Sequence, residues 1–508
     1  MTIDANSNNL ILGVVGAGAM GRGIAQVAAA GGCAVLLFDT NLDTATDALE
    51  FIGNMLERNV EKGRMSQEDA ATGISKIQVV ASIADLAPCQ IVIEAVVESL
   101  EVKNVVFREI ESSVSADTII ASNTSSLSVT TIAAACERPE RIAGMHFFNP
   151  VPLMKLVEVI DGLCTAPHVA DVLMDLGRRM TRTPVRVKDA PGFLVNQVGR
   201  GYNIECAHIA SDGVASYAEI DRICREAVGF RMGPFELMDL TGVDVTHPAT
   251  NLIYEQFYHE PRFRPATLMQ MQLDAGLLGR KVGKGFYDYK EGKPEIEDEA
   301  FAPMFDGRPV WISNVEPDAS KKLAAIIVEA GAILETGDAP SLDALILVTP
   351  IGGDATNSAV SEGLDATRVV AVDTVFGLGQ HRTLMKTTVT KADFVAAAHG
   401  LLGGFSVPAT VISDTPGFIA QRAIAAICNI GCSVAQARTA APEDIDMAVV
   451  LALNHPMGPL AFGDSVGGDT ILKILRSIYS LTGDPRYRPA PWLRRRAELG
   501  ISLSTPEG

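Results

Sequence analysis

The N-terminal part of the chain alternates between short apolar runs and stretches with helical spacing. Residues 10–32 resemble a strand, a glycine turn and a helix of small side chains, and residues 33–39 form a second strand. Further short apolar runs lie at 77–80, 91–98, 118–124, 141–148 and 155–160. Because strands that alternate with helices build largely parallel sheets, this pattern predicts an α/β domain over residues 1–188.

The pattern changes near Asp189, where apolar residues begin to recur at helical spacing and continue to do so until about residue 280. A proline stands near the first helix start and a glycine near its end, as is typical of helix boundaries. This predicts an all-α domain over residues 189–290. Residues 291–318 are acidic and contain prolines, so we expect a linker there.

Motifs of the helical domain return in the second half of the chain, which indicates an internal repeat. KDAPGFLVNQ at 188–197 reappears 225 residues later as SDTPGFIAQR at 413–422. MGPFELMDLTG at 232–242 reappears as MGPLAFGDSVG at 457–467, and RFRP at 262–265 as RYRP at 486–489. We therefore predict a second helical module at 413–508, preceded by a degenerate sheet remnant at 319–412.

Composition narrows the possible partners and the compartment. The chain has 508 residues, 47% of them hydrophobic, which predicts several domains with apolar cores. A net charge of −19 argues against nucleic acid or an anionic membrane surface as a partner. The eight cysteines show no metal-binding spacing and predict reduced thiols without a metal site. With no membrane-length apolar run and no leader-like N-terminus, we expect a cytoplasmic protein.

The glycine turn after the first strand has the G-x-G-x-x-G pattern that lets backbone N–H groups approach a pyrophosphate at a helix N-terminus. Asp39 ends the next strand, where its carboxylate can accept a ribose 2′-OH, although a turn cap is the alternative. No arginine follows it immediately, which favours NAD over NADP. The predicted Rossmann-type cofactor site consists of Gly16, Gly18, Ala19, Met20, Gly21 and Asp39.

Two further regions carry side chains suited to hydride-transfer chemistry. His146 ends one strand-like run and Glu158 lies in the next, so a base and the carboxylate that orients it could be neighbours. Spacing alone favours a structural histidine. The polar run ASNTSSLS at 121–128 follows a strand, where α/β folds bind ligands, but helix capping explains it equally well. Asn196 could be a simple exposed helix position.

Seven stretches together resemble the L-3-hydroxyacyl-CoA dehydrogenases, over residues 10–290 and in the same order. They are GAGAMGRGIA, VIEAVVESLEVK, ASNTSSLS, HFFNPVPLMKLVEVI, KDAPGFLVNQ, GPFELMDLTG and GKGFYDY. The second half is similar to the duplicated C-terminal module of long bacterial forms, including those of phenylacetate degradation. The resemblance implies NAD-dependent oxidation of the 3-hydroxyl of an acyl-CoA, as in fatty-acid, hydroxybutyrate or aromatic-acid breakdown.

The resemblance also implies roles for single residues. His146 would be the general base and Glu158 its orienting partner, while Ser125 and Asn196 would hold the substrate oxygen. Other residues would line the nicotinamide half of the site or close over the cofactor: Glu98, Lys103, Ser125, Asn149 and Lys281. Lys62, near Arg58 and Arg64, would bind a CoA phosphate, or would belong to a solvated helix face.

The second half departs from the family pattern, because Gln421 stands at the position that corresponds to Asn196 under the 225-residue offset. No second glycine fingerprint or HFFNP motif is present either. We therefore expect one active site per chain, and a second half that acts as a pseudo-dimer partner or a lid. The chain would be a homodimer or a pseudo-dimer through its helical modules.

Two alternatives remain open at this point. The chain could be another NAD-dependent β-hydroxyacid dehydrogenase on the same scaffold, although such enzymes rely on a catalytic lysine rather than a His–Glu pair. It could also be a non-catalytic structural relative, which the presence of Ser125, His146, Glu158 and Asn196 disfavours.

Overall fold

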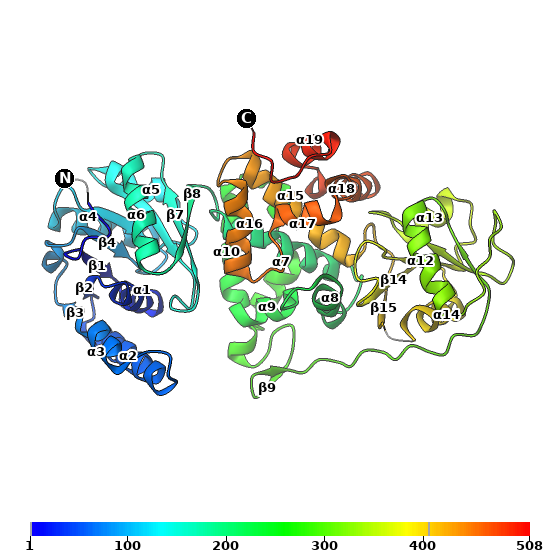
Figure 1. Cartoon of the computed structure of the whole chain (residues 1–508), viewed down its shortest axis with the longest axis horizontal. Helices are drawn as coiled ribbons and strands as arrows, with labels where there is room; N and C mark the ends of the chain where they lie inside the picture. The colour runs from blue at the N-terminus through cyan, green and yellow to red at the C-terminus, as the bar shows by residue number, and fades with distance from the viewer. Residues whose placement is uncertain (1–2, 405–406, 508) are drawn as a thin grey trace. The chain divides into compact units, whose positions relative to one another are not determined.

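The computed structural model describes residues 3–404 and 407–507. Internal contacts divide the chain into two compact units. The first unit contains Met1–Gln197 and Ala437–Leu453, and the second contains Val198–Gln436 and Asn454–Gly508. Figure 1 traces the chain from its N-terminal sheet, in blue and cyan, to its C-terminal helices, in red.

An eight-stranded sheet forms the centre of the first unit, in the order β3-β2-β1-β4-β5-β6-β7-β8. Neighbouring strands are parallel except β6 and β7, which pair antiparallel. The strands are β1 (Ile11–Val15), β2 (Ala34–Phe38), β3 (Ile77–Val80), β4 (Ile91–Glu94), β5 (Ile119–Ser122), β6 (Ile142–Phe147), β7 (Leu156–Asp161) and β8 (Thr183–Lys188). The predicted α/β fold is confirmed.

Helices cover both faces of this sheet because alternate strand residues enter two separate cores. Val14 and Val157 belong to one core, and Val15 and Val92 to the other. The first core is covered by α1 (Ala19–Ala30), α2 (Leu42–Glu61), α3 (Gln67–Ser75) and α6 (Pro167–Arg179). The second is covered by α4 (Leu100–Ser113) and α5 (Val129–Ala133). Helix α16 (Pro442–Leu453) also belongs to this unit.

The second unit combines the two helical modules with a smaller sheet. Helix α7 (Val195–Ser211) begins in the first unit and continues into the second. The first module continues with α8 (Tyr217–Ile223), the π-helix η3 (Cys224–Val228), α9 (Pro234–Thr241), α10 (Val243–Gln256) and α11 (Thr267–Asp274). The second contains α15 (Ile419–Gln436), α17 (Pro459–Val466), α18 (Gly468–Thr482), the 3-10 helix η6 (Pro485–Tyr487) and α19 (Pro491–Leu499).

The smaller sheet has the order β11-β12-β13-β14-β15. Its strands are β11 (Val310–Ile312), β12 (Leu345–Val348), β13 (Val369–Val372), β14 (Arg382–Lys386) and β15 (Ala409–Ile412). Its helices are α12 (Pro317–Glu329), α13 (Ala355–Ser361) and α14 (Ala392–Gly403). Strand β11 and the start of α12 lie inside 291–318, the segment predicted as a linker. Their pairing and packing partners are far along the chain, so local composition did not indicate them.

The smaller sheet repeats the second half of the larger one. Pairing runs parallel, antiparallel, parallel from β12 to β15, as it does from β5 to β8. Counterparts of β1, β2 and β3 are absent from its order, so this sheet lacks the strands that would carry a glycine-rich cofactor turn. The remnant therefore corresponds to the second half of the larger sheet.

The two helical modules meet through reciprocal ion pairs within the second unit. Arg264 donates to Asp484 at 2.7 Å, and Arg488 donates to Glu260 at 3.2 Å. These pairs are equivalent under the RFRP/RYRP repeat, because each joins an acidic residue of one copy to the second arginine of the other. Such reciprocity is the mark of an isologous interface.

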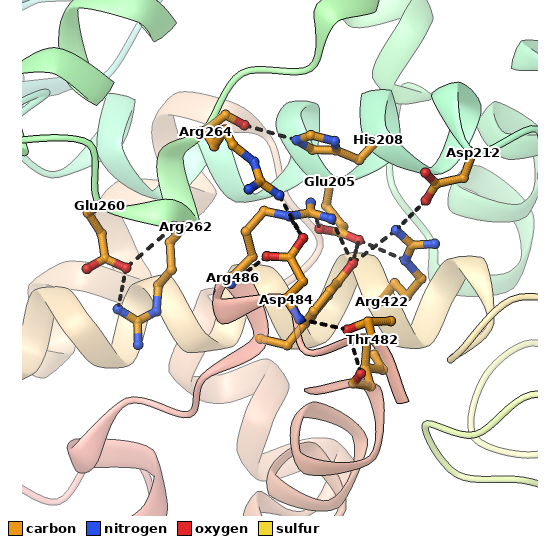
Figure 2. Close-up of polar contacts among 12 residues, drawn as sticks. Glu205, His208, Asp212, Glu260, Arg262, Arg264, Arg422, Thr482, Asp484 and Arg486 are labelled. Carbon is orange, nitrogen blue, oxygen red and sulfur yellow. Dashed lines mark hydrogen bonds and ion pairs between the residues drawn. The ribbon is translucent and has the colours of Figure 1, made fainter. Parts of the chain in front are cut away.

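A buried polar cluster lies at the centre of this interface (Figure 2). Glu205 on α7 accepts from Arg422 on α15 at 2.8 Å, from Arg486 at 2.8 Å and from the Tyr487 hydroxyl at 2.6 Å. Burial raises the pKa of Glu205, but Arg486 and Arg422 lower it by more, to about 2. The carboxylate therefore stays ionised between two guanidinium groups.

Candidate active site

The glycine turn between β1 and α1 has room for a phosphate. Gly16 adopts φ +100°, and a Cβ on Gly21 would lie 1.7 Å from the Gly16 carbonyl oxygen, so both positions require glycine. By contrast, apart from Gly18 itself and its two chain neighbours, no described residue comes within 4 Å of a Cβ placed on Gly18, which precedes the first residue of α1. Open space beside a helix N-terminus, where Ala19 and Met20 begin α1, suits a dinucleotide pyrophosphate.

Asp39 joins the end of β2 to the glycine turn. One carboxylate oxygen accepts the Ala17 N–H at 2.8 Å and the other accepts the Asn41 N–H at 3.0 Å. The turn-cap role is therefore present in the structure. Because a carboxylate has about four lone-pair positions, Asp39 can still accept a ribose hydroxyl. The donor set and the space around the turn fit NAD.

His146 and Glu158 are direct cross-strand partners on β6 and β7. Both are buried, with exposed fractions of 5% and 0%, and His146 Nδ1 lies 2.6 Å from Glu158 Oε2. An ionised carboxylate can only accept, so Nδ1 carries the proton and the lone pair of the neutral ring is on Nε2. Nε2 makes no hydrogen bond within the part of the chain that the structure describes. This nitrogen can therefore accept a proton from a ligand.

The N-terminus of α7 holds the other oxygen of Glu158. Oε1 accepts the N–H groups of Leu194 at 3.1 Å and Val195 at 2.9 Å. Backbone donors and the helix dipole both stabilise negative charge at this position. Both oxygens of the buried Glu158 therefore have hydrogen-bond partners.

The same helix end places Asn196 beside the polar loop that follows β5. Asn196 Nδ2 donates to the backbone oxygen of Ser125 at 3.2 Å. Both side chains are partly exposed. The four residues predicted as catalytic, His146, Glu158, Ser125 and Asn196, are therefore linked through the first turn of α7.

Glu98 organises the loop that carries Ser125. Its Oε1 accepts from the Thr124 hydroxyl at 2.7 Å, the Ser125 N–H at 2.9 Å and the Ser126 hydroxyl at 2.9 Å. Lys103 lies 3.3 Å from the other oxygen. Burial raises the pKa of Glu98, but Lys103 and these donors lower it by more, so the net pKa falls below its ordinary value. The predicted cofactor residues Glu98 and Lys103 thus adjoin Ser125.

Two further residues support the site, and motif reasoning did not single them out. Glu94 is fully buried at the end of β4, 2.7 Å from Lys103, and also accepts the Ser122 hydroxyl at 2.7 Å. Asn123 accepts the Phe147 N–H at 2.8 Å and so ties the end of β5 to the residue after His146. A charged residue in the apolar run IVIE was the available signal for Glu94.

The remaining predicted residues are exposed in the first unit or belong to the second. Asn149 is exposed in the turn after β6, and Lys62 is exposed at the C-terminal end of α2, near exposed Arg58 and Arg64. Lys281 belongs to the second unit, where its Nζ lies 2.5 Å from Asp244 Oδ2.

Strand register identifies what replaces the His–Glu pair in the second half. In the first sheet, Ile160 pairs with Val187. Ile412 is the repeat counterpart of Val187 and pairs with Met385 in the second sheet, so Met385 stands at the Ile160 position. Counting back two residues places Thr383 at the Glu158 position. The Asp373 N–H donates to the Thr383 carbonyl at 3.0 Å, so Asp373 occupies the His146 position.

The replacement residues bind each other. Gln421, at the Asn196 position, donates to Asp373 at 2.9 Å and accepts the Gly352 N–H at 2.8 Å. Both side chains are fully buried, and burial raises the pKa of Asp373 to about 6. The imidazole and its carboxylate partner are missing here, and the amide of Gln421 is bonded to Asp373, so this half does not repeat the His–Glu arrangement.

Neither a metal-binding cluster nor a membrane-spanning helix is present among the described residues. No group of His, Cys, Asp or Glu side chains in residues 3–404 and 407–507 is arranged to hold a metal ion. No helix in those ranges combines the length and the apolar character needed to cross a bilayer. All eight cysteines are thiols rather than disulfides.

Comparison with known proteins assigns three stretches of the chain to one family. Residues 11–190 match the family profile described as 3-hydroxyacyl-CoA dehydrogenase, NAD binding domain. Residues 192–289, and again residues 417–507, match the C-terminal domain of the same family. The predicted cofactor, NAD, is confirmed by the first match, and the predicted repeat agrees with the second.

Several relatives match over much of the chain. The 3-hydroxyadipyl-CoA dehydrogenase of Escherichia coli (strain K12) is 35% identical over 96% of this chain and 97% of that protein. A crystal structure of 3-hydroxybutyryl-CoA dehydrogenase from Escherichia coli K12 superimposes with a TM-score of 0.85, at 34% identity over 97% of this chain and 99% of that one. A probable 3-hydroxybutyryl-CoA dehydrogenase of Bacillus subtilis is 39% identical over 55% of this chain and 96% of that protein. The chain belongs to the 3-hydroxyacyl-CoA dehydrogenase family, as a long member with one NAD-binding domain and two copies of the C-terminal domain.

Proposed function

We propose that the chain oxidises the 3-hydroxyl of an (S)-3-hydroxyacyl-CoA to a ketone, with NAD as the oxidant. The observation that carries this proposal is the buried pair of His146 and Glu158, 2.6 Å apart, in a domain of the NAD-binding family. NAD, when bound, would accept the hydride from the carbinol carbon. Every other step falls to the side chains around His146.

His146 is the general base of this reaction. Its Nε2 takes the hydroxyl proton as the hydride leaves, and Glu158 stabilises the imidazolium that forms. The Leu194 and Val195 N–H groups hold Glu158 in place. A positioned base of this kind contributes about 10²- to 10⁴-fold to the rate.

Ser125 and Asn196 hold the substrate oxygen. The contact between Asn196 and the Ser125 backbone sets their separation, and the Glu98 contacts fix the loop. Polar groups fixed in advance lower the barrier because they need not reorganise as charge develops. We assign Glu98, Lys103 and Asn149 to the cofactor, together with the glycine turn and Asp39. Lys62 is our candidate for a CoA phosphate.

The acyl group that the site prefers is a separate part of the proposal. Two relatives match nearly the whole chain, and one is named for 3-hydroxyadipyl-CoA whereas the other is named for 3-hydroxybutyryl-CoA, as are shorter relatives. We propose a dicarboxylic six-carbon acyl group as the preferred one, with the four-carbon 3-hydroxybutyryl group as the second candidate. Eight thiols in a chain of this size support a cytoplasmic location.

The second half acts as a built-in dimer partner with no active site of its own. Supporting this, the reciprocal pairs Arg264–Asp484 and Arg488–Glu260 form the kind of interface that two identical subunits would form. The Asp373–Gln421 contact fills the site of the second copy. We therefore propose one NAD bound per chain.

The test combines a substrate panel with one variant. Purified protein should oxidise NADH in the presence of acetoacetyl-CoA, and kcat/KM should be higher for 3-hydroxyadipyl-CoA than for 3-hydroxybutyryl-CoA or longer substrates. Preference for free hydroxy acids would indicate another β-hydroxyacid dehydrogenase. Absence of turnover would indicate a non-catalytic structural relative. His146→Gln should lower kcat by about 10²- to 10⁴-fold with NADH affinity nearly unchanged. Turnover at the wild-type rate in that variant would refute the assignment of the base.

A further inference from the structure

One helix of the second module belongs to the unit that contains the proposed active site. Residues 437–453, here named the α16 segment, share a compact unit with Met1–Gln197 rather than with the rest of their own module. By the repeat offset, α16 is the counterpart of α8 in the first module. The duplication therefore contributes structure directly to the NAD-binding unit.

The α16 segment lies on the face of the sheet that carries Glu158. The opposite face is occupied by α6, because a Cβ on Gly177 of that helix would lie 3.1 Å from Val157 and 3.0 Å from Pro184. Strand alternation then places Glu158 and its cross-strand partner Val185 on the other face. Helix α16 contacts both β7 and β8, whereas a helix beside the sheet edge would reach β8 alone. Val185 is fully buried although β8 is an edge strand.

A backbone hydrogen bond fixes the α16 segment at the end of β8. The Lys188 N–H, which points away from β7, donates to the Thr439 carbonyl at 2.8 Å. The next residue, Asp189, bonds the Ser128 hydroxyl at 2.8 Å and the Thr130 N–H at 2.7 Å. Residues 189–196 then lead directly to the N–H groups that hold Glu158. The Lys188 bond thus anchors the start of the segment that positions the His–Glu pair.

The same bond recurs in the second unit. The Ser413 N–H donates to the Val214 carbonyl at 2.9 Å, and both residues are the repeat counterparts of Lys188 and Thr439. There the contact anchors the remnant sheet, in which Asp373 and Thr383 replace the His–Glu pair. Each sheet is therefore completed by the module of the other half, but only one of the two contacts serves a proposed active site.

We propose that the α16 segment is a positioning element of the active site: the second module holds residues 189–196, and through them Glu158, Asn196 and His146, in the arrangement that turnover requires. This inference rests on the proposed function of the His146 site. It explains why a half that lacks its own base is part of the working enzyme. The segment touches neither the reacting atoms nor the cofactor in this proposal.

Proline at position 188 tests the anchor because it removes the N–H donor. Proline is tolerated at the outward side of an edge strand. Lys188→Pro should lower kcat by about tenfold or more relative to Lys188→Ala, which removes only the exposed side chain, because small misplacements of catalytic groups are costly. KM for NADH should change by less than about twofold. Equal kcat in the two variants would overturn the proposal.

Ser413→Pro is the matched control, since it removes the equivalent donor on the inactive sheet. It should keep the wild-type kcat even if it lowers Tm as much as Lys188→Pro does. A similar loss of kcat in Ser413→Pro and Lys188→Pro would mean that general destabilisation explains the effect. If wild-type protein shows no acetoacetyl-CoA-dependent activity at all, the proposed function itself fails, not only this inference.

Hydrogen exchange gives a second measurement that does not depend on a folded variant. In wild-type protein, NAD with acetoacetyl-CoA forms a complex that cannot turn over. Amides of residues 442–453 should exchange more slowly in that complex, whereas those of the counterpart helix, residues 217–223, should not. Unchanged exchange over residues 442–453 would overturn the proposed coupling.

Discussion

Glu158→Gln should abolish most turnover by reversing the hydrogen bond to His146. Glutamine can present its oxygen to the Leu194 and Val195 N–H groups, as Glu158 does now. Its NH₂ group would then take the place of Glu158 Oε2, which lies 2.6 Å from His146 Nδ1, and would donate a hydrogen bond to Nδ1. The ring would have to accept at Nδ1 and carry its proton on Nε2. In that tautomer Nε2 cannot take a proton from the substrate.

The expected loss in kcat is about 10²- to 10⁴-fold, the contribution of a positioned base, which corresponds to about 3–5 kcal/mol in the barrier. Folding stability should fall much less, because the neutral side chain keeps both backbone hydrogen bonds and loses only their charge-assisted part. Replacing charge-assisted hydrogen bonds by neutral ones costs about 1–2 kcal/mol. The variant should therefore be folded, bind NADH and turn over slowly.

Stopped-flow NADH oxidation with saturating acetoacetyl-CoA measures this effect, and NADH fluorescence titration checks the fold. Asp373→Asn is the matched control, since it makes the same acid-to-amide change at the His146 position of the second half. It should keep the wild-type kcat. If Glu158→Gln retained turnover within about threefold of wild type, the tautomer argument would be wrong.

Other predictions concern the cofactor, the module interface and pH. Asp39→Asn should raise the Kd for NAD about tenfold through the lost ribose acceptor, and an unchanged Kd by isothermal titration would place that contact elsewhere. Glu205→Gln should destabilise the second unit by about 3 kcal/mol in calorimetry, because it leaves Arg422 and Arg486 buried with less counter-charge, and an unchanged Tm would contradict this. Burial raises the pKa of Asp373 from 3.8 to about 6, so the folded state holds a proton that the unfolded state loses. Because of this proton, the free energy of unfolding of the wild type falls as pH rises from about 4 to 6. In urea unfolding, Asp373→Asn should therefore gain stability relative to wild type by up to about 3 kcal/mol between pH 4 and 7, whereas a pH-independent difference would refute the assignment.

Several features of this protein could be predicted from the sequence because neighbouring residues encode them. The glycine spacing after β1 predicts a cofactor turn, since a tight turn and a helix N-terminus need only contiguous residues. The short apolar runs that alternate with helical stretches predict the parallel sheet, and the 225-residue offset predicts the second helical module. The family resemblance singled out His146, Glu158, Ser125 and Asn196 as partners, but residue spacing alone favoured a structural histidine.

Tertiary structure decided which of those residues meet. His146 and Glu158 pair because of strand register, which depends on side-chain packing across the whole sheet rather than on the twelve-residue spacing. The same register places Asp373, with no sequence resemblance to the HFFNP motif, at the histidine position of the second half. Strand β11 is extended because β12 supplies its hydrogen-bond partners, so its own composition predicted a linker.

Local sequence thus determined most of the elements and the cofactor turn of this protein, because short-range sterics and hydrogen bonds act within a few residues. Only the tertiary structure assigned α16 to the NAD-binding unit, through a bond between Lys188 and Thr439. Contacts between residues so far apart in sequence leave no local pattern, because they depend on how complete elements pack together.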